Sequence, residues 1–199
     1  PTPFGFQQVH HNCFFNPFEG QIDTGKMMNA LIKKAVGLGT KILTGMNVKS
    51  TSAEGIVKLE NDFEIFGKKV IVATNGFANQ LLNVSVEPAR AQVLITKKIQ
   101  GLSIKGTFHM DQGYYYFRNI NDRILFGGGR QLDFEGEKTS KFGLNIHIQE
   151  RLSKLLKSVI LPQTPFEIDD RWNGIMGIGE MKLPFIKAFS DKLYCGIRL

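Results

Sequence analysis

Apolar residues recur at helical spacing in two stretches of this chain. In the first stretch, Asp23 or Thr24 can begin a helix, because either side chain accepts hydrogen bonds from the first free backbone amides. Gly37 and Gly39 end it, since glycine readily adopts the left-handed conformation at a helix terminus. The apolar face of this predicted helix carries Met28, Leu31, Ile32 and Ala35.

The second stretch predicts a helix from about Leu144 to Ser158, which Pro162 stops. One face of it carries Leu144, Ile148, Leu152, Leu155 and Val159. Stretches that read as strands alternate with these two helices along the chain, so the chain has mixed secondary structure.

The first half of the chain also predicts strands, at 41–43, 48–59 and 63–73, with a turn at 60–62. The last of these ends in the continuous apolar run 70–73, which is typical of a strand buried on both faces. Thr74, Asn75 and Gly76 follow it as a loop at the carboxyl end of the strand, where open α/β sheets bind ligands.

The second half has the alternating pattern of a half-exposed antiparallel strand. Residues 89–96 place Ala91, Val93 and Ile95 on one face and polar residues with Leu94 on the other. Further strands are predicted at 107–110, 113–118, 123–127, 166–172 and 192–197, with a hairpin turn at 119–122. We therefore expect an α+β or α/β fold.

Composition fits an ordinary globular chain of 199 residues, with 42% hydrophobic and 22% charged residues. No window approaches the ~20 apolar residues of a membrane-spanning helix. The net charge of +7 does not indicate a nucleic-acid partner, because the lysines are scattered and do not alternate with aromatic residues. The two cysteines, Cys13 and Cys195, are expected to be reduced, buried thiols of a cytoplasmic protein.

Self-contained catalytic motifs are missing from the sequence: it has no GxSxG elbow, no HExxH and no P-loop. His10 and His11 are adjacent and would point to opposite faces of a strand, so we expect no metal site there. His109 and His147 stand alone, as structural or exposed histidines do. Residues 127–129, three glycines, predict a strand end that something bulky approaches.

The aromatic run 114–118 is the most suggestive local feature. On a strand, Tyr114, Tyr116 and Arg118 share one face, and Tyr115 and Phe117 share the other. Two phenols and a guanidinium could line a polar pocket. The same pattern also fits a cross-strand aromatic ladder with a surface arginine, and the sequence leaves both readings open.

Four segments together resemble the superfamily of D-amino-acid oxidase, glycine oxidase and sarcosine oxidase, which are FAD-dependent oxidoreductases. Residues 20–42 are similar to its glycine–hydrophobic–acidic unit and helix, and 70–76 to its "V-V-x-A-A/T-G-A/G" strand. Residues 88–93 resemble "P-x-R-G-Q", the strand that leaves the flavin domain. Segments 171–176, 184–186 and 193–196 resemble "W-x-G-x-R/x … P-x-I-G … L-Y-x-A-x-G".

The resemblance implies a partial FAD-binding, Rossmann-like domain at 17–84, an antiparallel substrate-binding domain with one long helix at 85–175, and a return segment at 176–199. No residues before Gly20 match the family's G-x-G-x-x-G unit, and family members continue beyond the equivalent of Leu199. We therefore expect an internal fragment that holds no FAD and is inactive by itself. We also expect it to self-associate through apolar faces that the missing parts would cover.

The family positions carry over residue by residue. The resemblance implies cofactor contacts from Val48, Ala73, Thr74, Asn75 and Gly76, and substrate contacts from Tyr114, Tyr116 and Arg118. Met176 stands where amino-acid oxidases have an arginine that clamps the substrate carboxylate. Either Arg118 or Arg130 supplies that clamp, or the substrate is an amine without the carboxylate.

The expected activity is oxidation of a carbon–nitrogen bond of an amine or amino acid by hydride transfer to flavin, which needs no catalytic side chain from the protein. Two alternatives remain. One is an FAD-dependent dehydrogenase of a 2-hydroxy acid or polyol phosphate. The other is a non-catalytic, β-rich domain that binds a ligand through the Tyr114 and Tyr116 face.

Overall fold

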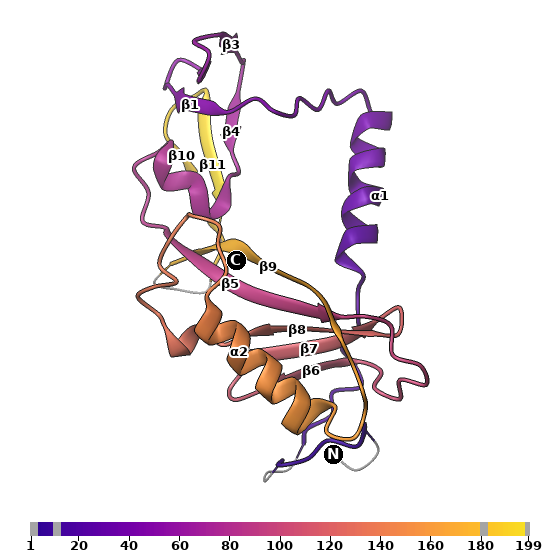
Figure 1. Cartoon of the computed structure of the whole chain (residues 1–199). Helices are drawn as coiled ribbons and strands as arrows, with labels where there is room; N and C mark the ends of the chain where they lie inside the picture. The colour runs from indigo at the N-terminus through magenta and orange to yellow at the C-terminus, as the bar shows by residue number, and fades with distance from the viewer. Residues whose placement is uncertain (1–3, 10–12, 180–182, 198–199) are drawn as a thin grey trace. The chain divides into compact units, whose positions relative to one another are not determined.

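A computed structural model describes residues 4–9, 13–179 and 183–197 of the chain (Figure 1). The helices are α1 (Thr24–Gly37), α2 (Ile146–Leu155), the 3₁₀-helices η2 (Asn75–Gln80) and η3 (Arg130–Leu132), and the π-helical turn η4 (Leu156–Ile160). The strands are β1 (Val48–Thr51), β2 (Ile56–Leu59), β3 (Glu64–Phe66), β4 (Val70–Val72), β5 (Glu87–Thr96), β6 (Thr107–Met110), β7 (Tyr115–Ile120), β8 (Arg123–Gly128), β9 (Ile168–Ile178), β10 (Phe185–Ala188) and β11 (Leu193–Ile197). His10 and His11 lie outside the described residues.

The chain packs as two units. Unit 1 comprises Pro1–Ile32, Ala91–Glu137 and Phe142–Gly174, and unit 2 comprises Lys33–Arg90, Lys138–Lys141 and Ile175–Leu199. Each unit is therefore assembled from segments that are distant in sequence. The domain ranges expected from the sequence, 17–84, 85–175 and 176–199, stay a prediction.

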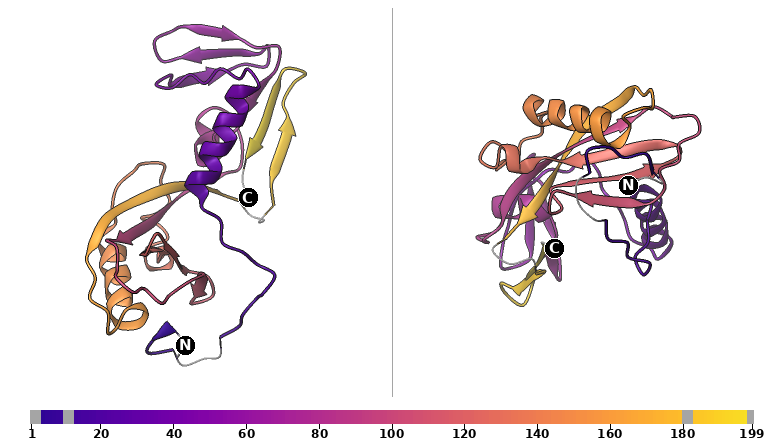
Figure 2. Two further views of the ribbon diagram at one scale, coloured as in Figure 1. Left: turned by 90° about the vertical axis from the view of Figure 1, so that its right-hand side faces the viewer. Right: turned by 90° about the horizontal axis from the view of Figure 1, so that it is seen from below.

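Unit 1 is a five-stranded sheet in the order β6-β7-β8-β5-β9, with α2 across one face (Figures 1 and 2). The pairs β6–β7, β7–β8 and β5–β8 are antiparallel. Its core is made of apolar side chains from the sheet and from α2, among them Leu94, Tyr115, Phe117, Ile124, Phe126, Ile148, Leu152, Leu156 and Ile160. The expected α+β class, with an antiparallel sheet and one long helix, is confirmed.

The buried face of α2 differs in part from the predicted one. The helix begins after Asn145, whose side chain accepts a hydrogen bond from the amide of Ile148 at 3.3 Å. Ile148 and Leu152 are fully buried as predicted, whereas Leu144 precedes the helix and is 43% exposed. The wider π-helical turn then rotates the face, so that Leu156 and Ile160 are buried in place of the predicted Leu155 and Val159, which lie partly buried at its edge.

Unit 2 contains two three-stranded sheets, β1-β2-β3 and β10-β11-β4. In the second, β4 runs parallel to β11, and Val72, Leu193 and Cys195 are buried together. The prediction that residues 70–73 form a strand buried on both faces is wrong in part, because Ile71 is 68% exposed. The described residues include no strand at 41–43 either, and Ile42 and Leu43 are exposed there.

Two hairpin turns lie where the sequence predicts them, whereas the strand predicted at 48–59 is divided into β1 and β2 by a turn at residues 52–55. Asp62 in the turn between β2 and β3, and Asn121 and Asp122 between β7 and β8, all have positive φ. Asparagine and aspartate tolerate this conformation better than other side chains do, and two such residues in succession suit the twist of a two-residue hairpin. The turn at Asn121 and Asp122 fixes the register of β7 against β8, pairing Ile120 with Arg123.

Helix α1 has no buried residue, although its sequence is amphipathic. Leu31 is 53% exposed and Ile32 is 45% exposed, and an exposed apolar helix face of this kind is typical of an interaction surface. Self-association through this face stays a prediction. Of the two thiols expected to be buried, Cys195 is buried, but Cys13 is exposed. No helix in the described part of the chain is long and apolar enough to cross a membrane.

Replacing Leu152 by alanine tests the packing of α2 on the sheet. We expect the free energy of unfolding to fall by about 2–5 kcal/mol, because the change leaves a cavity under a fully buried side chain. Chemical unfolding followed by circular dichroism measures it. The control is Leu144→Ala, at a position that the sequence places on the same face, and its cost should stay within ~0.5 kcal/mol. Equal losses for the two variants would contradict the observed face.

Candidate functional site

Strand β7 carries the predicted substrate-facing residues, and its two faces differ as the alternation predicts. Tyr115 and Phe117 are 3% and 4% exposed and belong to the core beneath α2. Tyr116 and Arg118 point to the opposite face and are half-buried. Tyr114 precedes the strand and is 40% exposed. The aromatic run therefore divides into a core half and an accessible half.

The ring of Tyr116 lies over Gly127 of the neighbouring strand β8. The two residues are paired across the strands, and a Cβ atom on Gly127 would come within 2.8 Å of both Cζ and Oη of Tyr116. The missing side chain leaves the room that the ring occupies, which agrees with the bulky approach predicted for residues 127–129. Burial raises the pKa of Tyr116, so its phenol stays neutral and able to donate a hydrogen bond beyond the ordinary range for tyrosine.

Arg118 holds the segment that leads into α1. Its Nη1 donates a hydrogen bond to the carbonyl oxygen of Ile22. Beside it, Gln21 Nε2 donates to the carbonyl oxygen of Asn119 at 2.5 Å. Asp23 then begins the helix by accepting a hydrogen bond from the amide of Lys26 at 3.0 Å. The far end of β7 thus anchors the chain immediately before α1.

Arg130 belongs to a separate aromatic cluster at the end of β8. Its guanidinium lies 5.1 Å from the centroid of the Phe134 ring, and the Tyr114 ring meets Phe134 edge-on at 6.1 Å. Gly129, with φ of 82°, makes the turn that presents Arg130. The Nε atom of Arg130 is buried and has no hydrogen-bond partner among the described residues. The structure therefore groups Tyr114 with Arg130 and Phe134.

In unit 2, the predicted cofactor loop packs against the predicted substrate position Met176. The chain leaves β4 through Ala73 and Thr74, both exposed, and turns into η2 at Asn75, whose φ is 47°. Gly76 is buried, and a Cβ atom there would lie 2.5 Å from the carbonyl oxygen of Met176. The Met176 side chain is 39% exposed. Only glycine permits this approach of the two backbones.

Val48, the remaining predicted cofactor residue, lies in the other sheet of unit 2. It begins β1, is 37% exposed, and pairs with Leu59 of β2. The preceding Asn47 lines an open cavity of about 190 Å³ together with Glu60, and its Nδ2 donates to Glu60 Oε2 at 3.2 Å. Val48 is therefore accessible and lies next to the polar residues Asn47 and Glu60, in a different sheet from the loop at 73–76.

Sequence reasoning overlooked one residue on the accessible face of the sheet. His109 of β6 is paired directly with Tyr116 of β7, so the two side chains share a face. The sequence predicts a strand from 113, whereas the structure has a tight turn at 111–114, and this turn places positions 109 and 116 opposite each other. Asp111 and Gly113, which are typical turn residues, were the signal that could have indicated it. In the described part of the chain, no three His, Cys, Asp or Glu side chains gather as metal ligands.

A side chain at Gly127 should displace the Tyr116 ring. In Gly127→Ala, the new Cβ atom cannot stay 2.8 Å from the phenol, so we expect the ring to swing off β8 in a crystal structure of the variant. The ring is the movable end of a side chain, so the free energy of unfolding should fall by only about 1 kcal/mol, the low end for overpacking. Gly174→Ala in β9 is the control, since nothing lies within 4 Å of its Cβ position. An unmoved Tyr116 ring would contradict this reading of the contact.

A family model described as "FAD dependent oxidoreductase" matches residues 2–196. No curated protein sequence matches this one. Among solved structures, L-proline dehydrogenase from P. horikoshii is similar, with 21% identity, a TM-score of 0.73, and coverage of 92% of this chain and 52% of that chain.

Two further solved structures share the fold. Glycine oxidase from Geobacillus kaustophilus has 16% identity and a TM-score of 0.74, with coverage of 92% of this chain and 50% of that chain. Fructosyl amine: oxygen oxidoreductase (Amadoriase I) from Aspergillus fumigatus has 14% identity and a TM-score of 0.69, with coverage of 90% of this chain and 47% of that chain. The chain therefore spans about half the length of these structures. Because the family match extends through both units, the chain belongs to the D-amino-acid oxidase family of FAD-dependent oxidoreductases.

Proposed function

We propose that this chain is part of an FAD-dependent enzyme that oxidises a carbon–nitrogen bond of an amine or amino acid. The observation that carries the proposal is the family match through residues 2–196. The names of the similar structures, a proline dehydrogenase, a glycine oxidase and a fructosyl amine oxidoreductase, support the choice of a nitrogen-bearing substrate. A cytoplasmic location stays a prediction.

The residues of unit 2 fit a role in holding part of FAD. Thr74 and Asn75 are exposed at the carboxyl end of β4, and the buried Gly76 behind them keeps that loop close to β9. With Ala73 and Val48, these residues would contact the cofactor. FAD, when bound, would supply the acceptor for a hydride equivalent from the carbon that bears nitrogen. These 199 residues contain no G-x-G-x-x-G loop to hold its pyrophosphate, so we expect them alone to be flavin-free and inactive.

The residues of β7 would bind and orient the substrate. The neutral phenol of Tyr116 can donate a hydrogen bond, and its ring over Gly127 offers an apolar surface that excludes water. Tyr114 would contact the substrate from the neighbouring cluster. Arg118, held by the carbonyl of Ile22, would support this face rather than clamp a carboxylate. Of the two arginines considered for a clamp, Arg130 is the one with a guanidinium nitrogen, Nε, that has no hydrogen-bond partner among the described residues.

Met176 directs the proposal toward amines. A thioether cannot form the bidentate, charge-assisted pair by which arginine orients a carboxylate. Its backbone packs on Gly76 while its side chain is 39% exposed, so the position could present a longer side chain without disturbing the loop. We therefore favour a substrate whose oxidised carbon does not carry a carboxylate.

A substrate panel on the whole protein tests the proposed function. We expect flavin reduction, followed with a dye acceptor, by primary or secondary amines or by amino acids. The panel also includes 2-hydroxy acids and polyol phosphates. Turnover of 2-hydroxyglutarate without turnover of any amine would refute the proposal in favour of carbon–oxygen oxidation. A whole protein that binds no flavin at all would favour a non-catalytic binding role.

Restoring an arginine at position 176 should shift the preference toward amino acids. In Met176→Arg, a charge-assisted hydrogen bond to the substrate carboxylate would contribute about 1.5–3 kcal/mol. The ratio of kcat/KM for an amino acid over its decarboxylated amine should rise by about tenfold or more. Met176→Gln, which adds hydrogen-bonding groups without charge, serves as the control. An unchanged ratio in Met176→Arg would contradict the assignment of Met176 to the carboxylate position.

A further inference from the structure

A fully buried carboxylate, Glu137, lies in the loop of unit 1 that precedes α2. Its exposed fraction is 0%. Gln92 of β5 donates to its Oε2 from Nε2 at 3.1 Å, and Asn145 donates to its Oε1 from Nδ2 at 2.9 Å. A buried carboxylate is costly unless its oxygens receive hydrogen bonds, and here each oxygen receives at least one from an amide. This arrangement fixes the loop to β5 and to the first residue before α2.

From Glu137, a line of two amide side chains leads to Arg171 of β9. Gln92 Oε1 accepts a hydrogen bond from Gln149 Nε2 at 3.2 Å, and Gln149 Oε1 accepts one from Arg171 Nη1 at 2.7 Å. Each amide thus donates toward the carboxylate and accepts from the side of the guanidinium. Aligned bonds of this kind strengthen one another in a medium of low polarity. Gln92 and Gln149 are 1% and 3% exposed, so water does not compete.

The guanidinium of Arg171 is fixed by one turn of α2. Its Nη1 also donates to the carbonyl oxygen of Gln149 at 3.3 Å, and its Nη2 donates to Ser153 Oγ at 2.9 Å. Ser153 Oγ in turn donates to the same carbonyl at 2.8 Å. Arg171 is therefore oriented by partners that are all neutral. The negative charge nearest along this line of bonds is Glu137, two amide side chains away.

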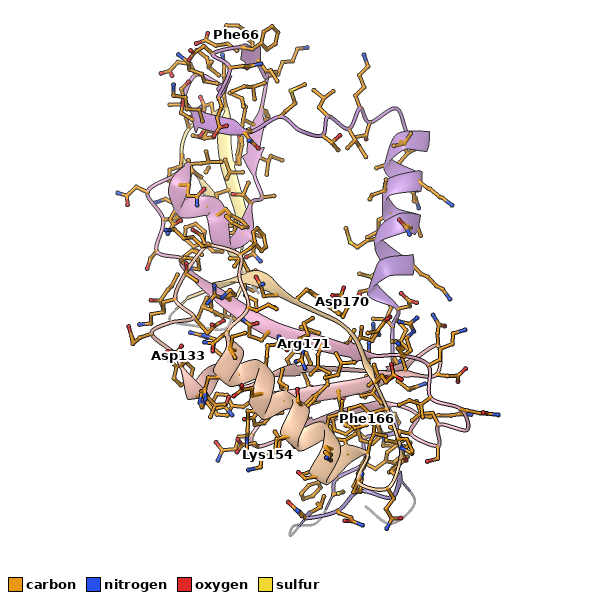
Figure 3. All side chains as sticks on the ribbon, viewed as in Figure 1. Phe66, Asp133, Lys154, Phe166, Asp170 and Arg171 are labelled. Atoms are coloured by element: carbon orange, nitrogen blue, oxygen red, sulfur yellow. The ribbon has the colours of Figure 1, made fainter. Side chains whose placement is uncertain are left out.

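We propose that Glu137 is a positioning residue that acts through Gln92 and Gln149 on Arg171, and so holds the middle of β9 in place. Figure 3 labels Arg171 on β9, Lys154 on α2 and Asp133 in the loop before it, and these are three of the four elements that this line of bonds joins, the fourth being β5. Trp172 follows Arg171 on the strand, so its side chain points away from α2 to the accessible face of the sheet, and it is 37% exposed. The consequence for substrate rests on the proposed function, because that face carries Tyr116.

The polar line of bonds is better suited to fixing a position than to adding stability. A buried polar network is of little net benefit over apolar packing, but removing one member leaves the others unsatisfied. Gln92 shares its buried face of β5 with Leu94 and Thr96. An apolar side chain in place of Gln92 would also pack on this face, but it would not fix the position of β9 relative to β5. A line of directed bonds permits only one alignment of β9 against α2 and β5.

A double-mutant cycle in the whole protein tests the coupling between Glu137 and Arg171. Glu137→Gln and Arg171→Met should each lower the midpoint of thermal unfolding by several degrees, because the first turns an amide nitrogen toward the donor of Gln92 or Asn145 and the second leaves Gln149 Oε1 without its donor from Arg171. The double variant should lose no more than the worse single variant. Additive losses would overturn the proposal. If Arg171→Met fails to fold, Arg171→Lys, which keeps a donor for Gln149 Oε1, takes its place in the cycle, and additive losses with Glu137→Gln would overturn the proposal equally.

Amide hydrogen exchange measured by mass spectrometry gives a readout that general destabilisation would not produce. Glu137→Gln should speed exchange of the β9 amides around Arg171 by about tenfold, which corresponds to a decrease of roughly 1.4 kcal/mol in the free energy of local opening. Exchange in β6, at the opposite edge of the sheet, should stay unchanged. Glu150→Gln, the same substitution at an exposed site of α2, is the control and should change neither strand. Equal acceleration in β6 and β9 would reduce Glu137 to a purely structural role and contradict the proposal.

Swapping the groups provides a rescue. The pair Gln92→Glu and Glu137→Gln moves the carboxylate one step along the line and should recover slow β9 exchange, whereas Gln92→Glu alone should not. With an active substrate, Glu137→Gln should raise KM severalfold while kcat changes less. If no substrate is turned over, the proposed function fails, but the cycle and the exchange measurement still decide the coupling. Failure of the rescue and an unchanged KM would each count against Glu137 as a positioning residue.

Discussion

The burial of one face of α2 on the five-stranded sheet is the contact on which the rest of unit 1 depends. Ile148 and Leu152 are fully buried against the sheet, each contributing on the order of 1.5–3 kcal/mol. Because Tyr115 and Phe117 point into this core, the alternation of the strand sends Tyr116 and Arg118 to the opposite face. The accessible face of β7 is thus determined by packing on its other side.

Much of this fold could be predicted from the sequence because its signals are local. The caps and glycines around α1, the turns at Asp62 and Asn121, and the alternation of β7 each depend on a few neighbouring residues. The π-helical turn after Leu155 could not be predicted, because its apolar residues fit an ordinary helix equally well. Residues 41–43 have strand-like composition, but a strand also needs a partner, which a local pattern cannot supply.

The candidate site was harder to predict than the fold, because its contacts join distant segments. Nothing near Gly76 indicates that its backbone meets Met176, one hundred residues further along the chain. On β5, Val93 and Ile95 belong to the more apolar of the two faces, so the pattern predicts that this face is buried. In the structure the opposite face, with Gln92 and Thr96, is the buried one. Thr96 there accepts a hydrogen bond from the amide of Ile124 at 3.0 Å, and Gln92 has Glu137 and Gln149. Polar residues are buried where partners from other segments satisfy them.

The contact between Arg118 and Ile22 has a consequence for how such chains diverge. Arg118 binds a main-chain carbonyl, and every amino acid at position 22 offers that same acceptor. The side chain of Ile22 is therefore free to change while the attachment of the segment before α1 persists. Positions 22 and 118 should accordingly show little covariation among related sequences, even though they are joined in space, and a method that infers contacts from correlated substitutions would overlook the attachment.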